Sequence, residues 1–266
     1  MGLLSLLGCQ FSTKELPRSL SELGVAVEVE QRTERSGYGR SDFEYTRVTA
    51  TLKNKKGVAI ESDQVTIRFD GEPLTSKVQT GNYGEHHPWH ELDVARHPIE
   101  ADREYLVEVV WTDGTVHRLG RLRTPKRLGV EQFDLPDSIG PGASLALTWR
   151  DLAEPIDLWA YRTWTYTDSL GNHVIEAGSA NDPEAIKKSI GPGIFRAANG
   201  SLPLPAAFLA PREGRRVVAV GFDLVARRSA GTSREFAKSS TLEAVRQVVL
   251  RTDVGDDGDR STEETR

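Results

Sequence analysis

This chain has only one cysteine, no positive net charge and no long apolar run. Its 266 residues include one cysteine, Cys9, so no disulfide can form within the chain. The formal net charge is −5 and the basic residues are spread along the sequence. This argues against a nucleic-acid partner, because phosphate binding requires a local surplus of Lys and Arg. No stretch beyond the first nine residues approaches the roughly 18 apolar residues of a transmembrane helix.

Catalytic motifs are also missing. The chain has no Gly-x-Ser-x-Gly elbow, and Lys-Ser/Thr follows neither Gly140-Pro141-Gly142 nor Gly191-Pro192-Gly193, so neither turn is a phosphate cradle. Acidic residues are numerous, but nothing in the sequence selects one carboxylate pair of the glycosidase type. We therefore expect no enzymatic activity and no cofactor. A hydrolase that uses an unidentified carboxylate pair stays open as the alternative.

Four histidines lie close together in the sequence: His86, His87, His90 and His97. Imidazoles at such spacing could ligate zinc or copper. The pair His90-Glu91 begins like the helical metalloprotease motif, but position 94 is Val where that motif needs His. The neighbouring residues indicate loop and strand, which favours solvent-facing histidines and no metal. A metal-dependent enzyme at His86–His90 is kept as an alternative.

An apolar stretch, MGLLSLLGC, leads to Cys9. The tetrapeptide Leu6-Leu7-Gly8-Cys9 resembles the lipobox of bacterial lipoproteins, with Leu6 at the apolar position and Gly8 at the small one. The resemblance implies cleavage before Cys9, lipidation of its thiol and attachment to a bacterial envelope membrane, on the outer membrane or facing the periplasm. It makes residues 1–22 a signal remnant followed by a polar tether.

The chemistry of such an anchor is simple. The peptidase must seat a small side chain beside the scissile bond, and Gly8 is the smallest available. Each buried methylene of an acyl chain contributes about 0.8 kcal/mol, so durable anchoring takes more than one chain. The same nine residues are also compatible with an apolar chain end that happens to carry one cysteine.

Residues 23–126 contain alternating runs typical of half-buried strands. Asp70-Gly71 and Asp113-Gly114 separate such runs, and Asp-Gly between them is the strongest short hairpin signal, because Gly accepts positive φ. About seven strands in about 100 residues predict an immunoglobulin-like β-sandwich. The segments Val48–Ala59 and Val65–Phe69 resemble the front half of bacterial immunoglobulin-like repeats, which supports the fold alone.

Residues 127–252 are predicted to form a second sandwich, which makes the fold class all-β with two tandem immunoglobulin-like domains. Trp149 ends an early alternating run and is expected to point inward. Val217 to Ala226 form a long late run with Val218, Val220, Phe222 and Leu224 on one face. This order resembles fibronectin type III modules. Ser240 to Leu250 fits a capped helix or a closing strand, and the sandwich favours the strand.

Two further segments complete the second half of the chain. Residues 181–188 are compatible with a single helical turn, in which Asp182 caps the start. Residues 253–266 are acidic and almost free of apolar side chains. We expect this segment to be a disordered tail, because it has no apolar surface to bury.

Aromatic residues gather on one predicted strand of the second domain: Trp159, Tyr161, Trp164 and Tyr166. If Trp159 and Tyr161 pack inward, Trp164 and Tyr166 lie on the other face, where their rings can stack on a sugar or a protein partner. The alternative is that the core covers one face and the neighbouring domain the other. Trp164 and Tyr166 are the binding candidates that the sequence offers.

The sequence therefore predicts a non-enzymatic, membrane-tethered lipoprotein of the cell envelope. It is expected to act as an interaction or scaffold module for an unidentified protein or carbohydrate ligand. A spacer that only holds another domain away from the membrane is a third possibility. A pocket with convergent polar groups would favour an enzyme, and shallow surfaces would favour a module.

Overall fold

Strands account for most of the computed structural model, which is nearly all β, as predicted. The structure describes residues 12–35, 43–80, 86–140, 143–167, 173–178, 193–195, 197–204, 209 and 216–255, with 164–167, 173–178 and 193–195 described by their backbone alone. Of two 3-10 turns, η1 (Leu20–Glu22) precedes the first strand and η2 (Val130–Gln132) lies between two later strands. Within these residues no helix has the length and apolarity to cross a membrane.

Four long strands determine how the chain divides: β1 (Gly24–Arg35), β2 (Phe43–Lys53), β16 (Arg216–Ala230) and β17 (Thr241–Val254). The chain forms two compact units, and each of these strands contributes residues to both. Unit 1 comprises Met1–Glu30, Thr46–Pro125 and Arg227–Val245, and unit 2 comprises Gln31–Tyr45, Lys126–Ala226 and Arg246–Arg266.

This division differs from the predicted consecutive domains 23–126 and 127–252. The chain does pass from one unit to the other at Pro125, but Gln31–Tyr45 and Arg227–Val245 each belong to the unit opposite to the one expected. The reason is strand length. Strands of 11 to 15 residues are about twice as long as those of an ordinary sandwich, so one strand supplies side chains to two cores.

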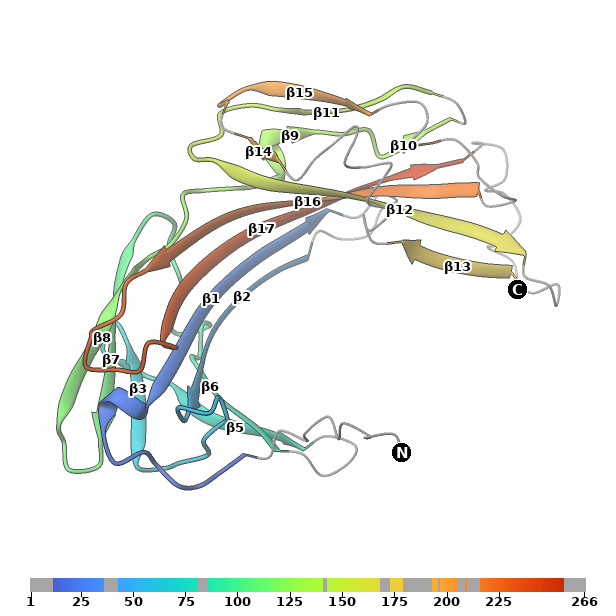
Figure 1. Cartoon of the computed structure of the whole chain (residues 1–266). Helices are drawn as coiled ribbons and strands as arrows, with labels where there is room; N and C mark the ends of the chain where they lie inside the picture. Colours follow the sequence, from blue (N-terminus) through green and yellow to red (C-terminus); the bar gives the residue numbers. More distant parts are fainter. Residues whose placement is uncertain are drawn as a thin grey trace. The chain divides into compact units, whose positions relative to one another are not determined.

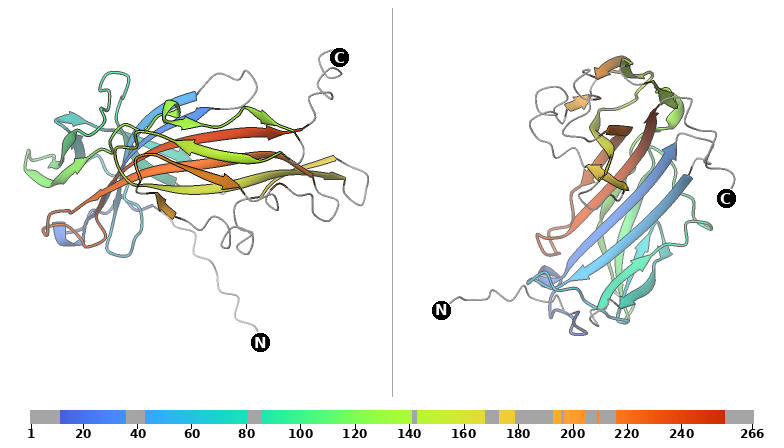
Figure 2. Two further views of the ribbon diagram at one scale, coloured as in Figure 1. Left: turned by 90° about the horizontal axis from the view of Figure 1, so that it is seen from above. Right: turned by 90° about the vertical axis from the view of Figure 1, so that its right-hand side faces the viewer.

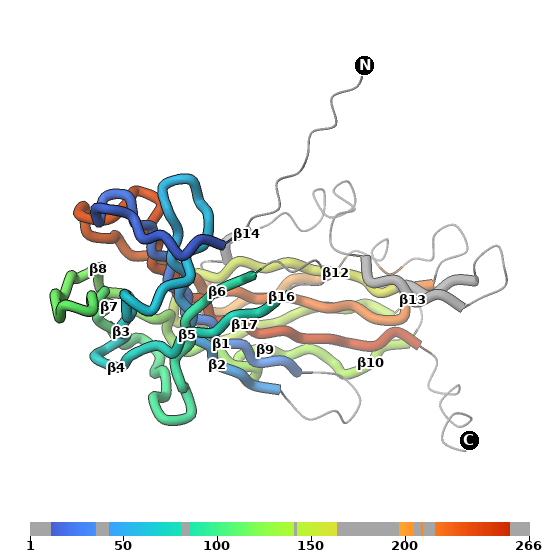
Figure 3. The backbone as a smooth tube through the Cα atoms, turned by 90° about the horizontal axis from the view of Figure 1, so that it is seen from below, coloured from blue at the N-terminus to red at the C-terminus, as the bar shows by residue number. Residues whose placement is uncertain are grey.

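Unit 1 pairs two sheets around one core. Strands β3 (Val65–Phe69), β4 (Glu72–Pro73), β7 (Glu104–Trp111) and β8 (Val116–Arg123) form one sheet in the order β4-β3-β7-β8. The other sheet has the order β17-β1-β2-β6-β5, in which β6 spans His86–Glu91 and β5 spans Thr75–Thr80. Figure 3 shows β5 and β6 side by side. Alternate residues of both sheets point into the core, which includes Val27, Ile67, Val107, Leu119 and Leu242.

The β3–β4 hairpin confirms the predicted turn at Asp70-Gly71. Asp70 has φ 53° and Gly71 has φ 88°, so both central residues adopt the left-handed region that a type I′ turn requires. Phe69 pairs with Glu72 across it. Gly114 of the second predicted turn also has a positive φ, 84°.

Unit 2 also has two layers, visible in Figure 1 and from above in Figure 2. Strands β9 (Phe133–Asp134), β11 (Leu145–Trp149) and β15 (Gly200–Leu204) form one layer in the order β15-β11-β9. The other contains β12 (Ile156–Thr167) between β13 (His173–Gly178) and β16, followed by β17, β1 and β2. The short strands β10 (Ser138–Ile139) and β14 (Gly193–Phe195) pair with β17 and β12.

The core of unit 2 lies between these layers. Leu145, Leu147 and Trp149 reach it from β11, and Leu158, Phe222 and Leu250 reach it from the facing layer. Trp149 is inward, as predicted, with 8% of its surface exposed. On β16 the inward set is Val217, Val220, Phe222 and Leu224, so Val218 does not belong to it. A register shift opposite Thr163 and Trp164 changes the alternation there, and period-two reasoning cannot foresee such a bulge.

The C-terminal segment is a strand, so the interpretation of Ser240 to Leu250 as a closing strand is confirmed. The predicted tail was placed two residues too early, because Asp253 and Val254 pair with Ser138 and Ile139 of β10. That parallel pairing fixes their backbone despite the acidic composition that follows. Residues 256–266 and the predicted turn at 181–188 lie outside the described residues.

Candidate functional site

Strand β12 presents aromatic side chains on the face of its sheet that points away from the unit 2 core. Leu158 and Ala160 alternate into the core, which leaves Trp159 and Tyr161 on the opposite face. Trp159 is 38% exposed, a large value for a tryptophan. The inward packing considered for Trp159 and Tyr161 is therefore wrong, because the core selects the even-numbered residues of this strand. The side chains of Trp164 and Tyr166 lie outside the described residues, so their binding role stays a prediction.

Tyr161 lies against a glycine of the neighbouring strand. Gly221 is its register partner on β16, and a Cβ atom at position 221 would overlap the phenol ring. The ring therefore rests directly on the β16 backbone, which holds it flat along the sheet. Burial, and in second place the nearby Asp223 carboxyl, raise the pKa of the Tyr161 phenol.

Asp223 lies opposite Trp159 in the β12–β16 register. Burial raises the pKa of the Asp223 carboxyl above its ordinary value. The Arg32 cation and a hydrogen bond from Gln247 oppose this rise, and Glu34 adds to it. Arg32 donates to Glu34 at 3.2 Å, and its Nε is buried without a partner in the described structure. This half-buried carboxyl therefore lies in a polar surrounding beside two aromatic rings.

We call this surface the Trp159 face, defined by Trp159, Tyr161, Asp223, Gln247, Arg32 and Glu34. It combines an exposed indole with carboxyl, amide, guanidinium and phenol groups, all within unit 2. Asp223 was not predicted from the sequence. The available signal was its position, as the one acid within the apolar run from Val217 to Ala226.

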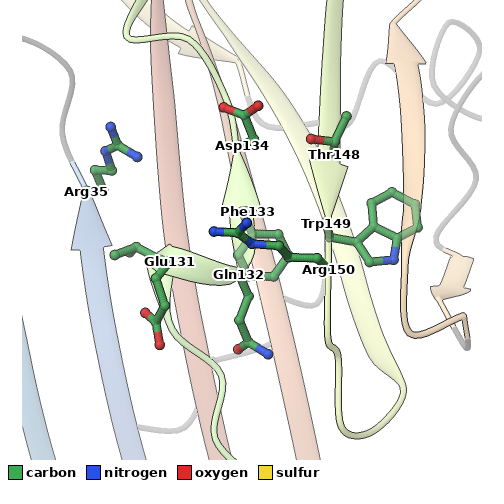
Figure 4. A pocket seen from close by; sticks show the side chains of 9 residues that line it. Arg35, Glu131, Gln132, Phe133, Asp134, Thr148, Trp149 and Arg150 are labelled. Atoms are coloured by element: carbon green, nitrogen blue, oxygen red, sulfur yellow. The ribbon is translucent and has the colours of Figure 1, made fainter.

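Unit 2 also contains a cavity of about 710 Å³ over the β9–β11 pair, shown in Figure 4. We call it the β9–β11 cavity. Its buried walls are Phe133 and Trp149, and the Trp149 Nε1–H donates to the Ala197 carbonyl at 3.1 Å. The remaining lining is mainly polar: Arg35, Val130, Glu131, Gln132, Asp134, Thr148 and Arg150.

The charged groups of this cavity fall into two classes. Arg35 contacts Asp137 at 3.3 Å, and Glu131 contacts Arg127 at 2.7 Å, so both are neutralised by neighbours. The side chains of Asp134 and Arg150 have no hydrogen-bond or ion-pair partner within the part of the chain that the structure describes. The sequence offered no signal for these two residues, because nothing local distinguishes them from other surface charges.

A smaller cavity in unit 1, of about 280 Å³, provides a contrast. There Arg103 contacts Asp70 at 2.9 Å and Glu100 at 2.6 Å, and its guanidinium lies 5.0 Å from the centroid of the Tyr105 ring. The backbone N–H of Glu100 donates to the Tyr105 hydroxyl at 2.7 Å. These groups neutralise one another, so we assign this cavity a structural role.

The histidine cluster is spread along strand β6 and beyond it. His86 is exposed, with its Nδ1 3.7 Å from Glu61, and His87 is exposed on the opposite face of the strand. His97 lies 3.4 Å from Glu72. His90 corrects the expectation of solvent-facing histidines, because it is only 3% exposed. Strand alternation turns its ring into unit 1, because the segment expected to be loop and strand is strand from His86 to Glu91.

Burial governs the chemistry of His90. It lowers the pKa of the imidazole, because a charged ring is poorly solvated there. Ala50 is the register partner of His90 on β2, and its backbone opposes this lowering of the pKa. The contact does not reach hydrogen-bond geometry, so neither ring nitrogen has a partner among the described residues. In that part of the chain, His, Cys, Asp and Glu side chains form no group of three that could hold a metal ion. Cys9 lies outside it.

Comparisons with known proteins add little. No family model matches the chain, and no curated protein matches it. Among solved structures, the chain is similar to the yeast delta-COP-I mu-homology domain at 10% identity, over 90% of this chain and the whole of that domain, with a TM-score of 0.28. At that TM-score the likeness does not bear on fold or function.

Proposed function

We propose that this protein is a non-enzymatic binding module of the bacterial cell envelope, anchored through lipid on Cys9, whose Trp159 face binds a carbohydrate. The observation that carries the carbohydrate proposal is the pairing of exposed Trp159 with half-buried Asp223 across β12 and β16. Envelope location rests on the lipobox resemblance at Leu6-Leu7-Gly8-Cys9.

The chemistry of a sugar fits this face. A pyranose ring has an apolar C–H surface that stacks on an indole, and its rim carries hydroxyls that both donate and accept hydrogen bonds. Trp159 supplies the stacking surface. Asp223 and Glu34 supply acceptors, and the Arg32 guanidinium supplies donors. Tyr161, held on Gly221, extends the aromatic surface at a fixed position.

The fold proposed for each unit is an immunoglobulin-like sandwich. Each unit has two sheets around one core, which supports an immunoglobulin-like sandwich for each. In this proposal the two sandwiches share strands β1, β2, β16 and β17, and a module built on rigid strands presents its binding groups without ordering a loop.

A glycan array tests the carbohydrate proposal, followed by calorimetric titration of the glycan that binds. Trp159→Ala is expected to weaken binding by about five- to 150-fold, because stacking on an aromatic ring contributes roughly 1–3 kcal/mol. Phe43→Ala is the matched control. Phe43 is a 56% exposed aromatic residue of the same unit that is not among the residues defining the Trp159 face, and its removal should leave affinity unchanged. Equal affinity of the wild type and Trp159→Ala for every glycan would end the proposal.

The anchor has a separate test. Cells that express the full gene are labelled with palmitate, and the membrane and soluble fractions are compared. Label in the wild-type chain and its loss in Cys9→Ala are expected. A wild-type chain that takes up no label and stays soluble would remove the envelope location but leave the Trp159 face untouched.

One observation favours a hydrolase as the second candidate. A carboxyl whose pKa is raised is what a general acid needs near neutral pH, and Glu34 provides a second carboxylate close to Asp223. In this alternative the chain releases reducing ends from the glycan that it binds, and Asp223→Asn stops the release. If the wild type releases no reducing ends, the hydrolase is excluded and binding alone is left.

A further inference from the structure

Within the part of the chain that the structure describes, the β9–β11 cavity carries one carboxylate, Asp134, and one guanidinium, Arg150, that have no ion-pair partner. Thr148 and Asp134 are register partners on the two strands, and Arg150 lies two residues beyond Thr148. Residues two apart on a strand share a face, so all three side chains lie on the same side of the β9–β11 pair. Figure 4 shows Arg150 extending from β11 toward β9, with Asp134 and Thr148 on neighbouring strands.

Geometry permits Asp134 and Arg150 to meet, yet they do not form an ion pair. Diagonal neighbours in an antiparallel pair are typically about 7–8 Å apart, within reach of a long arginine side chain. The other charged groups that line the cavity, Arg35 and Glu131, are paired with residues around it. Among its described lining residues, the cavity therefore offers one free anion and one free cation a short distance apart, with Thr148 directly opposite the anion in the strand register.

From this arrangement we infer that the β9–β11 cavity binds a small zwitterion, an α-amino acid or a short peptide, whose carboxylate contacts Arg150 and whose ammonium contacts Asp134. A guanidinium binds a carboxylate through two parallel hydrogen bonds, and a carboxylate accepts from an ammonium. At about 710 Å³ the cavity falls within the range of small-molecule sites. The inference is independent of the carbohydrate proposal, because it uses other residues and another layer of unit 2.

The two ends of the ligand can be tested separately in the full chain. Trialanine carries both charges, N-acetyl-trialanine lacks the ammonium, and trialanine amide lacks the carboxylate. Binding is followed by NMR titration, with the Trp149 indole N–H in the cavity wall as one reporter. Trialanine is expected to bind at least about tenfold more tightly than either blocked form, because each charged hydrogen-bond set contributes at least 1.4 kcal/mol or so.

Variants assign each charge to its residue. Arg150→Gln should remove the discrimination against trialanine amide and keep that against the acetylated form. Asp134→Asn should do the reverse. Arg216→Gln and Asp157→Asn change charges of the same unit outside the cavity and should leave both preferences intact.

L-Alanine separates the two ligand sources. Affinity equal to that of trialanine indicates a free amino acid, and binding of trialanine alone indicates a peptide. The inference is overturned if trialanine causes no shifts, if the blocked forms bind as tightly as trialanine, or if Arg150→Gln and Asp134→Asn retain both preferences. None of these results touches the Trp159 test, so failure of one proposal is distinguishable from failure of the other.

Discussion

The ring of Tyr161 rests on the backbone of Gly221, its register partner across the β12–β16 pair. This contact exists because position 221 has no side chain, since a Cβ there would overlap the ring. It fixes the aromatic surface beside Trp159 and Asp223, so one glycine on β16 positions a phenol on β12.

Gly221→Ala should therefore displace the Tyr161 ring. We expect a loss of roughly 1–3 kcal/mol in the free energy of unfolding, the usual cost of overpacking, together with weaker glycan binding. Gly140→Ala is the matched control, because a Cβ at that position of the same unit has nothing within 4 Å. Urea unfolding and titration measure both effects. An unchanged midpoint and affinity in Gly221→Ala would mean that the ring moves aside without consequence.

His90 gives a prediction about pH. Burial lowers the pKa of the folded imidazole, so the unfolded chain takes up the proton first as the pH falls. The wild type should thus lose stability as the pH drops below the unfolded value of about 6.5, and this loss should level off below the lower folded pKa. Unfolding midpoints compared at about pH 8 and about pH 5 should show this dependence reduced in His90→Leu.

The same substitution should stabilise the protein at neutral pH. Leucine has a similar size and removes two buried ring nitrogens that have no hydrogen-bond partner among the described residues, which contributes about 1–3 kcal/mol. His87→Leu, at an exposed position of the same strand, serves as the control and should change little. A lower free energy of unfolding in His90→Leu would contradict the conclusion that the His90 ring nitrogens lack hydrogen-bond partners in the part of the chain that the structure describes.

Shared strands predict that half-chains will not fold. A segment covering residues 20–127 lacks Phe236, Leu242 and Ala244, which belong to the unit 1 core. A segment covering residues 128–254 lacks the Gln31–Tyr45 part of unit 2. We expect neither segment to show a cooperative thermal melt, whereas the full chain does. Cooperative melting of either segment by circular dichroism would show that its core is complete without the shared strands.

Trp149 tests the unit 2 core. Trp149→Ala should cost about 3–5 kcal/mol, because it empties a buried site against which Gly200 packs closely. Trp149→Phe retains much of the apolar volume but loses the hydrogen bond to Ala197, so it should cost less. Trp159→Ala, at an exposed position, should stay within about 0.5 kcal/mol of the wild type. Chemical denaturation should show the largest loss of stability for Trp149→Ala, a smaller loss for Trp149→Phe and the smallest for Trp159→Ala. Another order would contradict the assignment of Trp149 to the core and of Trp159 to the surface.

Strands and turns could be predicted from the sequence because their causes are local. Alternation over five to eight residues indicated β3, β7, β8 and β11, and Asp70-Gly71 indicated a hairpin because few other residues accept its φ values. The inward position of Trp149 followed from the same alternation. The lipobox pattern at Cys9 is equally local and therefore remains a sequence-based expectation.

The candidate sites depend on pairing between distant segments, which alternation does not encode. Asp223 lies opposite Trp159 only because β12 and β16 adopt one register, and a slip of one residue would turn every side chain to the other face. The aromatic residues of β12 did not show which face of the strand enters the core. The structure shows that it is the face of Leu158 and Ala160. Likewise, strands long enough to serve two cores look the same locally as shorter ones. The sequence by itself thus determined where strands begin and turn, whereas hydrogen bonding between remote strands decided which side chains meet.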